Sequence, residues 1–175
     1  MSEARSQLAD QAGELRRLFD RAFAEPVRGD VASTDDLLAF RIGSEPYALR
    51  LTEIAGLFAG RRISRLPGSH GAFLGLVGFR GSIVPAYDLQ VLLGRPALDA
   101  PRWLAVASAA LVAFAFETFE GHLRVPRDAI MPRQASERSN PLIREFAPAA
   151  ASARPIVHLP SVLDAVQSRL AGDDR

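Results

Sequence analysis

Between residues 37 and 125 the sequence consists of short apolar runs, each interrupted by residues that favour turns. In Tyr47–Leu51 the large apolar side chains occupy every second position, which is the period of a half-buried strand. The run at residues 37–42 and the turn residues 43–46 come just before it, so the two runs predict a β-hairpin. Between residues 63 and 87, further apolar runs joined by glycine-bearing turns predict a strongly curved sheet or a barrel.

Apolar residues at helical spacing recur in several segments. Residues 3–25 place apolar side chains at intervals of three and four, with charged residues between them, and predict an N-terminal amphipathic helix. A short helix is predicted for residues 52–58, and another after Asp88, which caps its start while Gly94 ends it. Ser161 has the character of a capping residue and predicts a C-terminal helix after it.

The second half of the chain returns to strand-like sequence. Residues 118–121 join two of its apolar runs and predict a second hairpin. Residues 132–154 are rich in proline, alanine, serine and arginine, and predict an exposed loop. The strands of this half are predicted at residues 103–107, 111–117, 122–125 and 155–159.

Composition excludes several classes of function. The chain has no cysteine, which excludes a disulfide framework, a thiolate nucleophile and a zinc site with cysteine ligands, and suits a cytoplasmic protein. The longest uncharged apolar run, Trp103–Phe116, has 14 residues. It is shorter than the roughly 20 that a membrane-spanning helix needs, so we expect no membrane insertion. The 21 basic residues, all arginine, nearly balance 20 acidic ones, and a net charge of +1 gives little attraction for nucleic acid.

No catalytic constellation is recognisable in the sequence. His70, His122 and His158 are far apart, without the spacing of metal ligands. The glycines of the segment from Gly71 to Gly81 lie at the wrong intervals for a phosphate-binding or dinucleotide-binding loop. We therefore expect a protein without catalytic residues, metal or cofactor.

Three ordered segments resemble the CheW-like family. They are Leu38–Leu49, then Ile63–Gly68, and then Gly75–Gly94, which reads GLVGFRGSIVPAYDLQVLLG. The last segment is the most specific, because it combines glycines, Arg-Gly, a proline between apolar residues and Asp-Leu in a fixed order. The resemblance covers residues 36–168.

That resemblance implies a mostly β fold of two small five-stranded β-barrel lobes packed side by side, with an N-terminal helix and a short C-terminal helix. It also implies a chemosensory adaptor whose partners are the regulatory domain of a CheA-type histidine kinase and the signalling tip of a chemoreceptor, without a cofactor. We expect a helical extension at residues 1–32, the CheW-like domain at 33–170 and a tail at 171–175. In the second half, His122, Arg124 and Arg127 depart from the family pattern.

The candidate site lies in the most specific segment. Arg80 is expected to project from a turn between strands, where a guanidinium can bond two partners at once; alternatively, it bonds carbonyls of its own loop. Pro85 points to a strand edge or bulge, where another chain can dock. The receptor-binding candidates are Phe79, Arg80 and Gly81, the kinase-binding candidates are Ile83, Val84 and Pro85, and the structural turn and cap residues are Gly78, Asp88 and Gly94.

Two other interpretations remain open from the sequence. One is a divergent CheW-like regulator that engages only one of the two partners. The other is a small β-barrel that binds nucleic acid, in which Arg80 and the basic cluster of Arg61, Arg62 and Arg65 meet phosphates while Phe79 or Tyr87 stacks on bases. For the basic cluster itself, a solvated surface and a contact with a polar partner are both compatible with the sequence.

Overall fold

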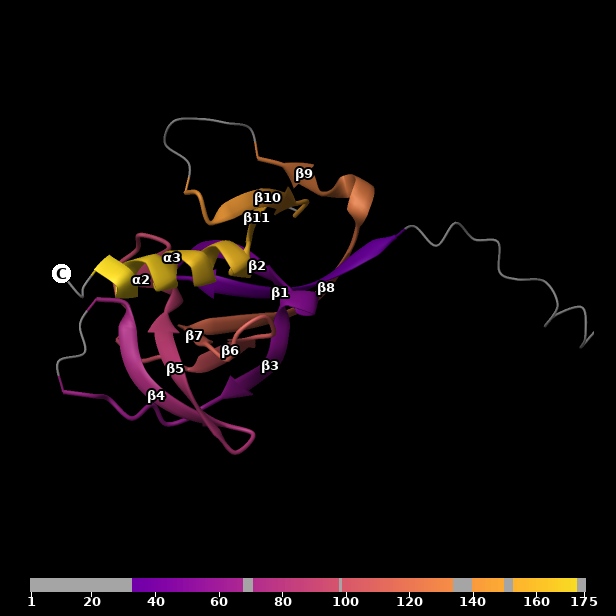
Figure 1. Cartoon of the computed structure of the whole chain (residues 1–175). Coiled ribbons are helices and arrows are strands. Elements are labelled where there is room, and N and C mark those ends of the chain that lie inside the picture. The colour runs from indigo at the N-terminus through magenta and orange to yellow at the C-terminus, as the bar shows by residue number, and fades with distance from the viewer. Residues whose placement is uncertain (1–32, 68–70, 98, 134–139, 150–152, 173–175) are drawn as a thin grey trace, which may run out of the picture. The chain divides into compact units, whose positions relative to one another are not determined.

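A computed structural model describes residues 33–67, 71–97, 99–133, 140–149 and 153–172 (Figure 1). These residues form two β-sheets and two helices, and we name the sheets A and B. The amphipathic helix predicted for residues 3–25 lies outside the described residues. A helix that could span a membrane is not found among the described residues.

Sheet A has six strands in the order β8-β1-β2-β11-β10-β9. Its strands are β1 (Thr34–Ile42), β2 (Glu45–Arg50), β8 (Thr118–Pro126), β9 (Met131–Pro132), β10 (Ile143–Ala147) and β11 (Arg154–Val157). Sheet B has five strands in the order β3-β6-β7-β5-β4. Its strands are β3 (Ile54–Ala59), β4 (Phe73–Phe79), β5 (Ser82–Asp88), β6 (Trp103–Ala107) and β7 (Ala113–Phe116). The helices are α2 (Leu89–Leu92) and α3 (Leu159–Gly172), and single 3₁₀ turns span Leu51–Glu53 and Arg127–Ala129.

Each sheet combines strands from both halves of the sequence. In sheet A, β1 pairs antiparallel with β8, and β2 pairs parallel with β11, which continues to β10 and β9. Sheet B joins β5 to β7 by a parallel pair as well. The mostly β class and the two-lobe division are as expected, but the prediction of two five-stranded barrels is corrected to two open sheets of six and five strands in the described part of the chain. One isolated bridge between Ser64 and Leu76 ties the segment after β3 to the outer edge of β4.

Several strands have apolar residues at every position because they are covered by apolar clusters on both faces. In β7, Phe114 and Phe116 face a large central cluster, whereas Ala113 and Ala115 face a smaller cluster enclosed by sheet B. Sheet A encloses a third cluster that includes Leu37. Alternate residues of a strand point to opposite faces, so a strand covered on both faces is apolar throughout. The alanines suit the narrow interior of sheet B.

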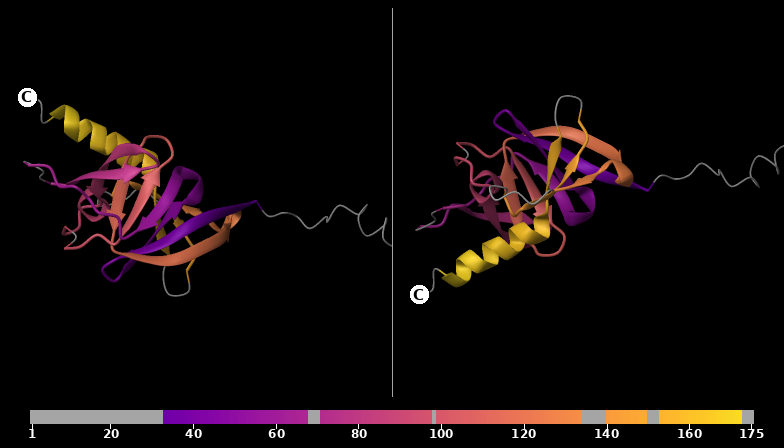
Figure 2. Two further views of the ribbon diagram at one scale, coloured as in Figure 1. Left: turned by 90° about the horizontal axis from the view of Figure 1, so that it is seen from below. Right: turned by 90° about the horizontal axis from the view of Figure 1, so that it is seen from above.

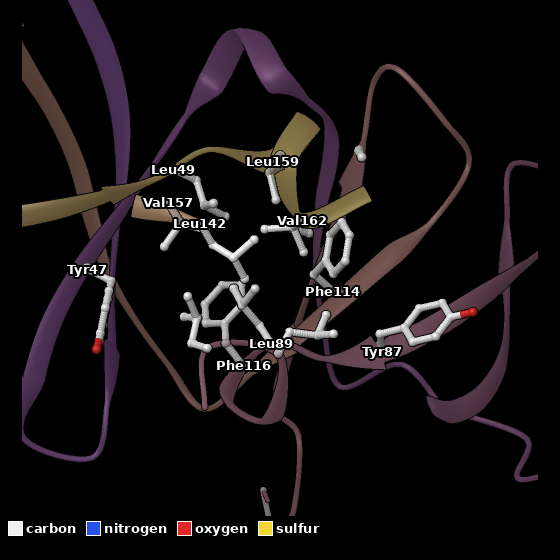
Figure 3. Packing of buried hydrophobic residues seen from close by; sticks show 14 of the residues in the cluster. Tyr47, Leu49, Tyr87, Leu89, Phe114, Phe116, Leu142, Val157, Leu159 and Val162 are labelled. Atoms are coloured by element: carbon white, nitrogen blue, oxygen red, sulfur yellow. The ribbon is translucent and has the colours of Figure 1, made fainter. Parts of the chain in front are cut away.

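The central cluster lies where the two sheets and α3 meet. Figure 3 shows Leu159 and Val162 of α3 beside Phe114 and Phe116 of β7, with Leu49 and Val157 from sheet A around them. Both views in Figure 2 place α3 along one side of the two sheets. Burial of side chains of this size contributes about 1.5–3 kcal/mol each, so this cluster is the main attachment between the lobes.

The first hairpin is confirmed, but the helix predicted after it is wrong. Strands β1 and β2 pair antiparallel from Leu37 opposite Arg50 to Ile42 opposite Glu45. Only Leu51–Glu53 is helical, and the chain then forms β3. In β3, Leu57 packs against the central cluster and its neighbour Phe58 against the interior of sheet B. The strand therefore packs against two cores, so neighbouring residues are both apolar. In the sequence, this pattern resembles the apolar spacing of a helix.

The hairpin predicted around residues 118–121 is also wrong. Strand β7 ends at Phe116 and pairs with β6, while β8 begins at Thr118 and pairs with β1 of the other sheet. Phe119, expected in the turn, lies opposite Phe40 in sheet A, and its ring packs 5.0 Å from that of Trp103. The chain changes sheets here without a turn segment that the sequence would reveal.

The region predicted as an exposed loop contains strands. Within residues 132–154, β10 pairs with both β9 and β11, whereas residues 134–139 and 150–152 lie outside the described part. The C-terminal helix is confirmed, but it starts at Leu159 and runs through Gly172, past the predicted boundary at residue 170. His158 takes the capping role predicted for Ser161, because its Nδ1 accepts the Ser161 N–H at 3.2 Å.

Candidate functional site

The turn between β4 and β5 has an unusual backbone. Phe79 and Ser82 are the last paired residues, and Arg80 and Gly81 alone connect the strands. Their φ angles are +44° and +81°, and two positive values are what a type I′ turn requires. Arg80 is the one non-glycine residue with a positive φ in the described part of the chain. That conformation costs an arginine about 1–2 kcal/mol, so the fold holds Arg80 there against its local preference.

The side chain of Arg80 rests on a buried aromatic ring. Its Cζ lies 5.1 Å from the centroid of the Phe79 ring, within the range of a cation–π contact. Phe79 is only 6% exposed, because its ring packs into the interior of sheet B. Arg80 is therefore held from below while its guanidinium edges face solvent. No hydrogen bond to a carbonyl of its own loop is found within the described residues, so the loop-capping role is not seen.

Phe58 and Arg61 extend the contact between Arg80 and Phe79. The sequence did not indicate that these two pairs meet. The ring of Phe58 meets that of Phe79 edge to face, with centroids 5.4 Å apart and planes at 79°. The Cζ of Arg61 lies 5.2 Å from the Phe58 centroid. We call Phe58, Arg61, Phe79 and Arg80 the arginine–phenyl cluster. The Arg-Arg pair after an aromatic residue was visible in the sequence, but its contact with the distant β4–β5 turn was not.

The outer face of the same hairpin is apolar. Ile83, opposite Gly78, is 75% exposed, and Pro85, opposite Leu76, is half-buried. Pro85 precedes the β5–β7 ladder, which begins at Ala86, so its missing N–H leaves no gap in that ladder.

Val84 does not belong to this outer face. Its side chain is 0% exposed and lies opposite Val77 inside sheet B. Its proposed kinase contact is therefore corrected, because a strand that exposes Ile83 must turn Val84 inward.

The structural residues differ in what they do. Asp88 caps α2, and its carboxylate accepts N–H groups from Gln90 at 2.8 Å and Val91 at 3.4 Å. Gly94 follows α2 with a φ of +76°. Gly78, predicted as a structural turn residue, lies within β4 instead; its φ is outside the left-handed region and an added Cβ would meet no atom within 4 Å. The glycine that is sterically required is Gly75, where a Cβ would lie 2.2 Å from the Ser64 carbonyl oxygen.

The charged side chains on the strands of sheet A, Arg144 excepted, form ion pairs, whereas the arginines at the turn end of sheet B form none with the residues that the structure describes. Each ion pair between described residues has at least one partner on a strand of sheet A. His122 and Arg124 pair with Asp36, at 2.7 and 3.0 Å, and Arg127 pairs with Asp35 at 2.6 Å. The hydrogen bond from Arg124, followed by that from His122, lowers the pKa of Asp36. These departures from the family pattern are thus used inside the chain.

The exposed arginines near sheet B have no such partners. In the part of the chain that the structure describes, Arg61, Arg62, Arg65 and Arg80 form no ion pair and no hydrogen bond through their side chains. Figure 1 places the β4–β5 turn at the end of sheet B farthest from α3. This end of the molecule therefore presents free guanidinium groups beside exposed apolar surface.

The described histidines and the proposed base-stacking residues make contacts within the chain. His122 bonds Asp36 and His158 caps α3, while His70 lies outside the described residues. No group of three potential metal ligands occurs among the residues described. Phe79 and Tyr87, the proposed stacking residues, are 6% and 7% exposed, so neither ring presents a face to a nucleobase.

The two-sheet fold and the β4–β5 hairpin fall in a region that matches a known protein family. The sequence pattern of the CheW-like domain matches residues 36–167. The chain belongs to the CheW-like family. A relative from Rhizobium etli, described as a probable chemotaxis protein CheW, is 27% identical over 116 residues, which cover 64% of this chain and 74% of the relative. Proteins of the CheW-like family are scaffolds and adaptors in chemotaxis, and this chain, as a member, is not an enzyme.

The fold is also similar to a solved CheW structure. The crystal structure of the scaffolding protein TtCheW from Thermoanaerobacter tengcongensis superposes with a TM-score of 0.64. The match covers 71% of this chain and 89% of TtCheW at 14% sequence identity, so it supports the fold of this CheW-like chain. The arginine–phenyl cluster and the β4–β5 turn lie within the matched family region.

Proposed function

We propose that this CheW-like chain couples chemoreceptor signalling tips to a CheA-type histidine kinase in a cytoplasmic receptor array. One observation carries the proposal: Arg80 is exposed and unpaired, yet it is fixed in a left-handed conformation above a buried ring. Local strain of this kind persists where the surrounding fold imposes it, and it is frequent at binding sites. The chain would act without a cofactor, by placing its partners.

The receptor would meet the turn itself. Arg80 supplies up to five N–H donors in a planar fork, which suits oxygen acceptors on a helical hairpin. Phe79 supports that fork from beneath, and Gly81 allows the tight turn. A rigid strand pair is a better platform for recognition than a flexible loop, because less side-chain freedom is lost on binding.

The kinase would meet the outer face of the hairpin. Ile83 provides exposed apolar surface there, the half-buried Pro85 adds to it, and Leu76 adjoins Pro85 across the strand pair. An exposed isoleucine at the centre of an interface can bury most of its side chain against a partner. Val84 contributes only by supporting this face from inside.

A second candidate is favoured by the closeness of these two surfaces. Arg80 and Ile83 are separated by two residues on one hairpin. Coupling of two partners requires two surfaces that can be occupied together. If one partner covers both the turn and the outer face, the chain is a CheW-like regulator that engages a single partner.

Stepwise complex formation tests both. The full chain is first mixed with the regulatory domain of the kinase encoded with it, and the receptor signalling-tip fragment is then added. A ternary complex on size exclusion supports the adaptor; displacement of one partner by the other supports the regulator; binding of neither partner overturns both. Arg80→Asn is the informative variant, because asparagine tolerates a positive φ while it removes the guanidinium. It should weaken receptor binding about tenfold at an unchanged melting temperature, with Arg62→Asn as the matched control.

A further inference from the structure

The arginine–phenyl cluster joins two parts of the sequence into one cationic surface. Arg61 follows β3 and Arg80 follows β4, and they are connected only through the rings of Phe58 and Phe79. Each guanidinium lies over one ring, and the two rings contact each other edge to face. Both cations are therefore positioned by the same aromatic pair, in which Phe79 is buried and Phe58 half-buried.

The surroundings of the cluster fix that aromatic pair. A Cβ on Gly56 would lie 2.8 Å from Cε2 of Phe58 and 3.4 Å from Cε2 of Phe79, so the absence of a side chain there makes room for both rings. Phe79 packs with Val77 and Val84 inside sheet B. The guanidinium groups thus start from restricted positions, which reduces the entropy lost when they bind an anion.

No acidic group of the described chain neutralises these cations. The strands of sheet B carry a single charged residue, Asp88, and its carboxylate caps α2. By contrast, Arg41, Arg50, Arg124 and Arg154 on the strands of sheet A bind carboxylates, and of the arginines on these strands only the exposed Arg144 has no ion pair in the described structure. Two oriented and unpaired cations beside an exposed isoleucine are complementary to a surface that carries carboxylates and apolar side chains.

We propose that Arg61 and Arg80 form a two-arginine clamp for carboxylates of the receptor signalling tip, so that the contacting segment of that partner is acidic. The proposal rests on the receptor-binding function proposed above and adds the chemistry of the partner and a second recognition residue. Carboxylate oxygens fit the planar donors of a guanidinium whose opposite face is covered by a ring. Nucleic acid is the less suitable anion, because the phenyl rings that would stack on bases are already covered by the arginines and by the core.

The test compares charge reversals at neighbouring arginines. Binding of a purified receptor signalling-tip fragment is measured by calorimetry for the unaltered chain, Arg61→Glu and Arg62→Glu. Arg62 is exposed like Arg61 but contacts no aromatic ring among the described residues, so it controls for net charge. We expect Arg61→Glu to weaken binding at least about tenfold and Arg62→Glu by no more than about twofold. Affinity of the unaltered chain should fall as salt rises.

Two further experiments test whether the position of the rings matters and whether the ligand groups are carboxylates. Gly56→Ala should displace the Phe58 ring and weaken binding several-fold although both arginines remain, whereas Gly78→Ala should not. A tip fragment in which the contacting Asp and Glu residues are changed to Lys should lose binding to the unaltered chain and regain it with the Arg61→Glu, Arg80→Glu double variant.

The outcomes distinguish the two proposals. Failure of the unaltered chain to bind the tip overturns the receptor-binding function and the clamp with it. Binding that Arg61→Glu and Arg62→Glu weaken equally leaves the function standing and overturns the clamp. Equal or tighter binding of a generic single-stranded oligonucleotide, lost in Arg61→Glu, also overturns the acidic partner in favour of a phosphate ligand.

Discussion

The two sheets use arginine in different ways. On the strands of sheet A, every arginine except the exposed Arg144 pairs with Asp35, Asp36, Glu120 or Glu145, so these charges are satisfied within the chain. At the turn end of sheet B, Arg61 and Arg80 lie over phenyl rings and form no ion pair in the described structure. The same residue type is therefore structural in one lobe and available to a partner in the other, and the local supply of acidic residues decides which.

The largest expected effect concerns the apolar packing that joins the sheets. Phe116 is 0% exposed and packs 5.0 Å from Phe40 of sheet A. Phe116→Ala should lower the free energy of unfolding by about 3–5 kcal/mol, because it removes a buried ring and leaves a cavity. Chemical denaturation measures this. Phe119→Ala, at a half-buried position, should cost less; an equal loss would contradict the central position of Phe116.

The second-largest expected loss of stability comes from breaking the ion pairs of Asp35 in sheet A. Asp35 pairs with Arg50 and Arg127, and its side chain is only 12% exposed. Asp35→Ala should lower the free energy of unfolding by about 1–3 kcal/mol, because it leaves the partly buried Arg50 with one carboxylate partner fewer. Arg61→Ala, which breaks no ion pair in the described structure, should change it by less than about 0.5 kcal/mol. Similar losses in both variants would remove the contrast between the sheets.

The third prediction separates two glycines of the β4–β5 hairpin. Gly81→Ala should cost about 1–2 kcal/mol, because alanine must adopt a φ near +81°. Gly78→Ala should be nearly neutral, because its Cβ meets no atom within 4 Å. Thermal unfolding of the two variants measures the difference. A large loss in Gly78→Ala would contradict the strand position of Gly78 and favour the turn role expected from the sequence.

The smallest effect is a pH dependence of sheet A. Burial raises the pKa of Glu120, but hydrogen bonds from Arg41 and Arg154 outweigh it, so the pKa lies below its usual 4.5. A lowered pKa in the folded state means that this carboxylate stabilises the fold above pH 4.5 and that the contribution is lost as pH falls below it. Glu120→Gln should therefore show a shallower loss of stability in acid.

Glu53 has a pKa shifted in the opposite direction from that of Glu120, and it serves as a control for the pH dependence. Burial raises its pKa above 4.5, although the Leu159 N–H donates to its carboxylate at 2.9 Å. Because the pKa of Glu53 is raised in the folded state, the unaltered chain loses folding stability as pH rises above 4.5 and through that pKa. Glu53→Gln should abolish this part of the pH dependence. Identical pH profiles for the two variants would contradict both assignments.

Local features of the fold were predictable from the sequence. The β1–β2 hairpin followed from its two-residue period and turn residues, and α2 followed from Asp88 at its start and Gly94 at its end. The turn between strands that carries Arg80 was also expected, and it is the β4–β5 turn. These features depend on contacts within about ten residues, which a local pattern records.

Long-range features were not predictable in the same way. The passage of the chain from β7 to β8 exchanges sheets, and nothing local distinguishes it from a hairpin. Strand β3 contacts two cores and imitates a helix, and Val84 could not be assigned to the inner face until the register with Val77 was known. The contact of Phe58 with Phe79 joins segments that are distant in the sequence, so the arginine–phenyl cluster was invisible before the structure.

The central claim is that the turn end of sheet B, and not the charged face of sheet A, is the surface that meets the receptor. The most direct measurement compares the affinity of the receptor signalling-tip fragment for Arg80→Asn and Arg124→Asn. Arg124 is also exposed, but it is paired with Asp36. The account predicts a loss of about tenfold for Arg80→Asn and an unchanged affinity for Arg124→Asn. Unchanged binding in Arg80→Asn together with a loss in Arg124→Asn would contradict it.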